Sequence, residues 1–107
     1  MSKVYDISAK ITNSRPTIKI TKDIICEVNN RKSTVLNVQA MFKEAERKNT
    51  EEREIIEKAL VLLLGKDNAE KLEKLDLPFP EYMEAYHSVV ALAQGNDPTE
   101  EKATPSN

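Results

Sequence analysis

The chain lacks tryptophan and has only two glycines and one cysteine among its 107 residues. The single cysteine, Cys26, excludes an internal disulfide and any zinc site built on paired cysteines. The scarcity of glycine and aromatic residues leaves no glycine-rich loop for phosphates and no aromatic platform for stacked bases. Most nucleotide-dependent functions are therefore excluded, and the fold must be stabilised by side-chain packing.

Long hydrophobic runs are also missing. The longest covers six residues, 59–64, whereas a helix needs about 20 to cross a bilayer. The first ten residues contain no continuous apolar stretch, so we expect no secretory signal. Hydrophobic residues make up 39% of the chain and charged residues 32%, which is typical of a single small globular domain. We therefore expect a cytoplasmic protein without a membrane span.

The charges are unevenly distributed along the chain. Residues 1–32 carry seven basic and three acidic residues, a net charge of +4, whereas residues 33–107 carry nine and fifteen, a net charge of −6. Such asymmetry can align copies of the chain head to tail or steer one end towards an acidic partner. Nucleic-acid binding by the acidic part is disfavoured, because phosphate contacts need a positive surface.

The first third of the sequence predicts three short antiparallel strands. Apolar residues alternate with polar ones over residues 5–11, and β-branched residues recur over 17–21 and 24–28. The intervening residues 13–16, Asn-Ser-Arg-Pro, are typical of a turn.

From residue 33 onwards, the apolar spacing changes to that of helices, and four helices are predicted. Their expected starts are Ser33 or Thr34, Asn49–Thr50, Asp67 and Pro80, and Gly65 is expected to end the second with a positive φ. The second helix has the most regular apolar face, and the third should direct Leu72 and Leu75 towards the core.

These elements predict an α+β fold: an N-terminal three-stranded antiparallel sheet followed by a layer of about four helices. We expect one domain over residues 1–95. Residues 96–107 contain two prolines and only one apolar residue, Ala103, so they cannot offset the entropy of ordering. We expect them to form a flexible polar tail.

The sequence contains no arrangement of residues that predicts catalysis or metal binding. His87 is the only histidine, and a surface or boundary position is favoured over a general base. Cys26 lies in a β-branched run, which favours a buried, unreactive thiol. The glutamates at 51, 52, 54 and 57 lie at a helix start, where carboxylates stabilise the helix dipole. We therefore expect no catalytic residues, no cofactor and no metal.

Most of the aromatic residues lie near the start of the last predicted helix. Phe79, Tyr82, Met83 and Tyr86 follow one another there, next to acidic residues. Tyrosine and methionine are over-represented at protein interfaces, so these four residues are the candidate partner-binding site. The alternative is that they form part of the core, which is the usual fate of an amphipathic helix in a small domain.

Several segments together resemble a known family. They are the leucine-rich helix that ends at Gly65, the short stretch 71–75, Leu-Pro-Phe-Pro-Glu-Tyr-Met at 77–83, and the last helix, which closes near Ala-Gln-Gly at 93–95. The chain resembles, over about residues 33–95, the tail assembly chaperones of long-tailed bacteriophages and prophages.

The resemblance implies a non-enzymatic protein that binds the tape measure protein, a long helical polypeptide, and keeps it soluble until the tail tube surrounds it. Many copies of the chaperone would coat one tape measure protein. In the family, a longer form made by translational frameshifting carries an additional C-terminal domain that recruits tail tube subunits. The resemblance implies that this chain, with its polar tail from Asn96, matches the short form.

Two other classes of function can be weighed against this resemblance. A small DNA-binding regulator could use the helices within residues 50–75 as a helix-turn-helix. The helix that would read the DNA carries the basic residues Lys71 and Lys74 and the acidic residues Asp67, Glu70 and Glu73. This balance of charges is unfavourable for binding in a DNA groove. A catalytic accessory domain around His87 has no further residues to support it.

We predict that the tail can be removed without loss of stability. Truncation after Gly95 should leave the melting temperature, followed by circular dichroism, unchanged because residues 96–107 offer almost no apolar surface to bury. A large decrease in melting temperature would show that the tail packs on the domain.

Overall fold

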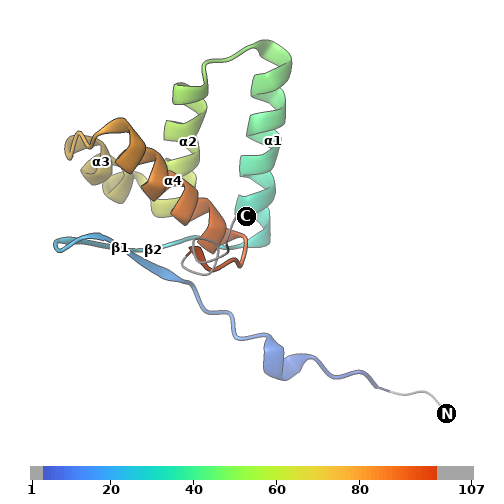
Figure 1. Cartoon of the computed structure of the whole chain (residues 1–107). Coiled ribbons are helices and arrows are strands. Elements are labelled where there is room, and N and C mark those ends of the chain that lie inside the picture. The colour runs from blue at the N-terminus through green and yellow to red at the C-terminus, as the bar shows by residue number, and fades with distance from the viewer. Residues whose placement is uncertain (1–3, 99–107) are drawn as a thin grey trace, which may run out of the picture.

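The computed structural model describes residues 4–98 and has an α+β architecture, with four helices covering one face of a small sheet (Figure 1). A short 3-10 helix, η1, precedes the sheet. The elements in chain order are η1 (Ser8–Lys10), β1 (Thr17–Thr21), β2 (Ile24–Glu27), α1 (Lys32–Lys48), α2 (Glu52–Leu64), α3 (Lys66–Lys74) and α4 (Phe79–Ala93).

The sheet consists of β1 and β2, which pair antiparallel with Ile18 opposite Cys26. The turn between the strands is closed by Thr21, whose hydroxyl oxygen accepts hydrogen bonds from the backbone N–H groups of Asp23 (3.3 Å) and Ile24 (3.2 Å). Ile24 and Cys26 point into the core, while Ile25 between them is exposed. The sheet is therefore buried on one face only.

The predicted first strand is wrong. Residues 5–11 form no strand and contain η1, and their apolar side chains are exposed, with Tyr5 82% accessible. The expected turn at 13–16 does not reverse the chain. Instead, the Asn13 side chain accepts a hydrogen bond from Arg31, and the Ser14 carbonyl accepts one from the Asn30 amide at 3.0 Å. These contacts direct the segment before β1 away from the helices (Figure 1).

Two of the predicted helix boundaries are confirmed and three are wrong. The helix α1 begins at Lys32 rather than after a cap at Ser33 or Thr34, and α3 begins at Lys66 directly after Gly65 rather than after a cap at Asp67. Gly65 ends α2 with φ of 90°, and Pro80 lies in the first turn of α4, both as predicted. Asn49 does not begin α2. It ends α1 in the left-handed conformation, with φ of 58°, and its N–H donates to the carbonyl of Ala45. Asparagine tolerates this conformation well, so it serves as a C-cap here.

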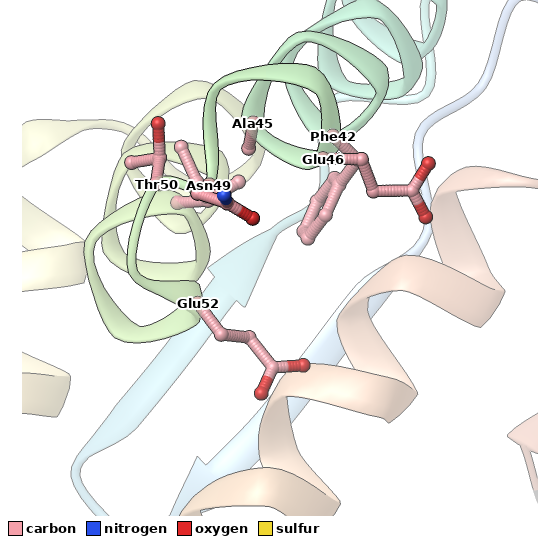
Figure 2. Close-up of a pocket in the computed structure, with 7 residues that line it drawn as sticks. Phe42, Ala45, Glu46, Asn49, Thr50 and Glu52 are labelled. Atoms are coloured by element: carbon pink, nitrogen blue, oxygen red, sulfur yellow. The ribbon is translucent and has the colours of Figure 1, made fainter.

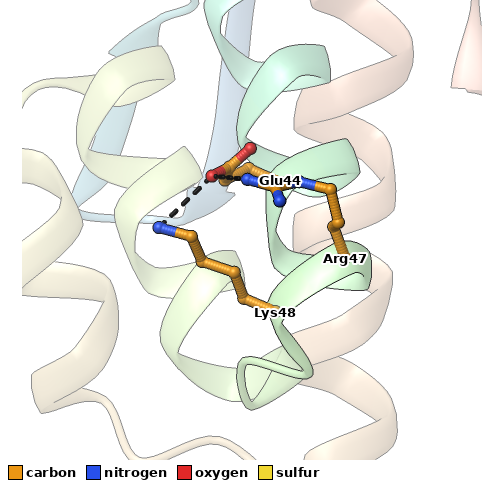
Figure 3. Close-up of polar contacts among 3 residues, drawn as sticks. All are labelled: Glu44, Arg47 and Lys48. Atoms are coloured by element: carbon orange, nitrogen blue, oxygen red, sulfur yellow. Dashed lines mark hydrogen bonds and ion pairs between the residues drawn. The ribbon is translucent and has the colours of Figure 1, made fainter.

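The outer face of α1 carries ion pairs. The Glu44 carboxylate lies 2.6 Å from the Arg47 guanidinium and 3.2 Å from the Lys48 ammonium (Figure 3). Hydrogen bonds from Arg47 and Lys48 lower the pKa of Glu44. All three side chains are well exposed, so these pairs belong to a solvated helix surface and add little to stability.

The core is centred on α2, which packs against α1, α3 and α4. One face of α2 is completely buried, and the backbone N–H of Asn29 donates to the carbonyl of Leu63 at 2.8 Å, which ties the end of the sheet to this helix. From the neighbouring elements, Val28, Leu72 and Val89 are fully buried against it. The buried residues of α2 are Ile55, Ile56, Ala59, Leu60, Leu63 and Leu64.

The third helix departs from its prediction at its end. Leu72 is fully buried, as expected, but Leu75 is 36% exposed. Leu75 follows the last residue of α3, and Asp76 then turns the chain with φ of 50°. The helical spacing therefore stops one residue too early to bring Leu75 into the core. Of the predicted tail, residues 99–107 lie outside the described part of the chain.

We predict that Leu63→Ala will lower the free energy of unfolding by about 2 to 5 kcal/mol, because the substitution leaves a cavity in the core. Leu63 is 2% exposed, whereas its neighbour Leu62 is 36% exposed. Leu62→Ala is therefore the matched control and should cost less than about 1 kcal/mol. Urea denaturation followed by circular dichroism measures both values. Equal losses would contradict the described orientation of α2.

Candidate partner-binding surface

The start of α4 is fixed by two prolines. Pro78 is extended and caps the helix, its carbonyl accepts a hydrogen bond from the N–H of Tyr82 at 2.9 Å, and Pro80 occupies the first turn. Proline suits these positions because the first N–H groups of a helix have no partner within it. Phe79, between the two prolines, lies at the edge of the core and is 73% exposed.

The exposure of the four predicted binding residues decreases along α4, from Phe79 at the surface to Tyr86 in the core. Phe79 and Tyr86 are seven positions apart and so share one helix face, yet Phe79 is exposed and Tyr86 is 8% exposed. Tyr82 and Met83 lie between them and are half-buried against the core. The Tyr86 ring lies against Phe42 of α1, with ring centroids 6.4 Å apart. Tyr86 thus corresponds to the core alternative, whereas Phe79 is accessible to a partner.

Tyr82 connects α4 to α3. Its hydroxyl donates a hydrogen bond to a carboxylate oxygen of Glu73 at 2.6 Å. Burial raises the pKa of Tyr82 well above its usual value, and the carboxylate of Glu73 raises it further. The tyrosine therefore stays protonated as a donor and holds the first turn of α4 next to the end of α3.

A hollow of about 240 Å³ lies beside Phe79, between α2, α3 and the start of α4. We call it the Phe79 hollow. Apolar side chains line it together with three carboxylates and one guanidinium, that of Arg53, which lies 3.9 Å from Glu57. The lining residues are Arg53, Glu57, Leu72, Glu73, Asp76, Leu77, Phe79 and Tyr82. A hollow with an exposed aromatic ring, apolar side chains and an excess of carboxylates suits an apolar side chain flanked by basic residues.

A second hollow, of about 340 Å³, lies where α1 meets α2. The Phe42 ring projects into it from α1, and the carboxylates of Glu46 and Glu52 extend from the two helices (Figure 2). Ala45 and Ile55 complete its apolar wall. Sequence reasoning missed this hollow, because it forms only where the end of α1 and the start of α2 come together in the folded chain.

The residues considered for chemistry lie apart from one another. His87 is exposed on α4, as expected. Cys26 is buried, as expected, and burial raises the pKa of its thiol, which favours the unreactive form. Within residues 4–98, no three acidic, histidine or cysteine side chains are grouped to hold a metal ion. No helix in this range is long and apolar enough to span a membrane.

Comparisons with other proteins identify no relative. No protein-family model matches the chain, and no curated protein or solved structure is significantly similar to it.

Sequence reasoning missed a group of exposed apolar side chains before the sheet. Val4, Tyr5, Ile7 and Ile11 are all exposed, although the alternation that begins at Tyr5 predicts a half-buried strand. The signal in the sequence was the alternation of apolar and polar residues over 5–11. It indicates that these residues suit a sheet, but it does not tell whether the strand pairs within the same chain.

We predict that the stability of the protein will fall at high pH, in part through Tyr82. Because its pKa is raised on folding, its contribution is complete below about pH 10, the usual tyrosine pKa, and is lost as the pH rises further. Tyr82→Phe should cost about 0.5 to 1.5 kcal/mol at neutral pH and reduce the alkaline loss. Denaturation curves between neutral and strongly alkaline pH measure both effects, and an unchanged alkaline slope would contradict this role.

Proposed function

We propose that this protein is a non-enzymatic tail assembly chaperone that binds and solubilises the tape measure protein during assembly of a phage tail tube. The proposal begins from the family resemblance over about residues 33–95. Its main structural support is the exposure of Phe79, a large aromatic side chain that is 73% exposed beside an acidic hollow. Exposed aromatic residues next to concave surfaces are typical anchors for a partner.

The partner that suits this surface is an amphipathic helix. A helix presents apolar side chains at intervals of three and four residues, and one of them could enter the Phe79 hollow while its neighbours contact Phe79. Glu57, Glu73 and Asp76 would then face basic residues on either side of the apolar stripe. This arrangement is the helix-in-groove mode of recognition. Met83 and the ring of Tyr82 continue the same surface towards the core.

A small surface of this kind explains why many copies would be needed for one partner. A single hollow of about 240 Å³ holds little more than one large side chain, so each contact is weak on its own. A long helical polypeptide offers many equivalent stripes, and binding along its length would cover the apolar surface that otherwise drives aggregation. The chaperone would act in the cytoplasm of the host cell, where tails assemble. A longer frameshifted form would add contacts with the tail tube protein.

The DNA-binding alternative has less support. Only Gly65 separates α2 from α3, whereas a helix-turn-helix uses a turn of about three to four residues. In addition, Ala69 and Leu72 of α3 are buried, and the exposed residues of this helix include as many acidic as basic side chains. We therefore do not carry this alternative further.

We predict that Phe79→Ser will abolish solubilisation of the tape measure protein without unfolding the chaperone. The exposed ring contributes little to the core, so the melting temperature should remain within a few degrees of the parent value. Co-expression with the tape measure protein of the same phage genome, followed by measurement of its soluble fraction, tests the effect.

Leu36→Ser is the matched control, because Leu36 is another exposed large apolar residue, 49% accessible, but lies on α1. It should leave solubilisation intact. Equal loss in both variants would indicate a general effect of surface polarity, and full solubilisation by Phe79→Ser would overturn the proposed anchor.

A further inference from the structure

The segment before the sheet has the composition of a strand but no strand to pair with. We call residues 4–12 the arm. Val4, Tyr5, Ile7 and Ile11 of the arm are exposed by 89%, 82%, 45% and 65%. Its only regular structure is η1. Two backbone hydrogen bonds hold it, from the N–H of Lys10 to the carbonyl of Ile7 and from that of Ile11 to the carbonyl of Ser8, and the N–H of Ser8 donates to the Asp6 carboxylate. A short exposed helix of this kind is easily exchanged for an extended conformation.

The sheet, for its part, has an unpaired edge. Within the described residues, β1 pairs only with β2, so its outer edge has no neighbouring strand. Free backbone N–H and C=O groups along an edge readily accept another strand. The edge of β1 is therefore a site where an extended segment can add main-chain hydrogen bonds.

A hollow of about 290 Å³ accompanies this edge, between β1 and the first half of α4. Its apolar walls are Ile18 and Ile20 from the strand and Leu77 and Ala85 from the helical side. A strand added beside β1 would direct alternate side chains into this space, under α4, because side chains of a strand point to opposite faces in turn. The hollow thus lies where the inward side chains of a third strand would be.

The arm of the same chain is held away from this edge. Residues 13 and 14, which would have to form the return turn, bond instead to Arg31 and Asn30 at the start of α1. Pro16 also accepts a hydrogen bond from the N–H of Val28 at 2.8 Å, so the chain continues alongside β2. The arm consequently projects away from the helices (Figure 1). Nine extended residues reach about 30 Å, enough to contact a second molecule.

We propose that the arm of one copy of this protein adds as a third strand to the free edge of β1 in a second copy, with Ile7 entering the hollow under α4 and Tyr5 and Ile11 on the same face of the strand to either side of it. Charge does not decide this pairing, because the arm carries one basic and one acidic residue, Lys10 and Asp6, and Lys19 lines the hollow together with Glu81 and Glu84. The apolar side chains of the arm and of the hollow therefore provide the contact. This inference does not depend on the proposed function, because it uses neither Phe79 nor its hollow.

The contact joins two different surfaces, the arm of one copy and the β1 edge of the next. Such head-to-tail contacts leave a free arm at one end and a free edge at the other, so they extend into rows unless they close into a ring. Isolated chains should therefore associate as their concentration rises.

Removal of the arm tests the contact. Sedimentation velocity over about a hundredfold range of concentration should show association of the full chain, while the chain lacking residues 1–12 should stay at the mass of one copy with an unchanged melting temperature. Ile7→Asn should weaken association at least about tenfold. Ser8→Asn, which alters the opposite side of the strand, should not. A full chain that remains monomeric, or an armless chain that associates equally well, would overturn the proposal.

Cysteine cross-linking identifies the surface that receives the arm. A chain with Ile7→Cys mixed with a differently tagged chain with Ala85→Cys should form a disulfide-linked heterodimer under mild oxidation, and a Ser8→Cys and Ala85→Cys pair should form much less. Cys26 is buried and should not interfere. When both substitutions are placed in one chain and diluted, a cross-link that forms only within that chain would show that the arm folds back, which would overturn the proposal.

Discussion

The structure depends on the packing of one face of α2. With a single cysteine in the chain, no internal disulfide can support the fold, and six buried side chains of this helix take its place at the centre of the core. The helices α1, α3 and α4 are placed by contact with it, and the hydrogen bond from Asn29 to Leu63 fixes the end of the sheet against it. The side chains of the other elements that are fully buried, Val28, Leu72 and Val89, belong to the same core as the buried face of α2.

This constraint explains the fate of the aromatic residues of α4. Tyr86 lies deep enough along its helix to meet Phe42 and is buried, while Phe79, one heptad earlier on the same face, lies past the edge of the core. Tyr82 stands between them and satisfies its hydroxyl through Glu73. A small domain has a core of limited width, so a continuous apolar stripe along a helix can begin as surface and end as core. The accessible end is the part available for binding.

What the sequence predicts well is what local chemistry decides. The four helices, the buried face of α2, the positive φ of Gly65 and the burial of Cys26 all follow from spacing or from the nature of one residue. Local chemistry does not decide whether Asn49 begins or ends a helix, because asparagine suits both a helix start and a left-handed helix end. The position of the arm and the exposure of Phe79 depend on contacts with residues that are distant in the sequence. Alternation at residues 5–11 indicates a strand without indicating which edge receives it.

The two proposed contact surfaces lie next to each other on the molecule. Leu77, in the link between α3 and α4, lines both the Phe79 hollow and the hollow beside β1. A strand that packs under α4 would therefore contact a residue that also lines the Phe79 hollow. If copies join through their arms, the repeat of one contact places successive Phe79 hollows at a constant spacing. A row of weak, equally spaced sites binds a long helical polypeptide far more tightly than separate copies would, because each contact raises the effective concentration of the next.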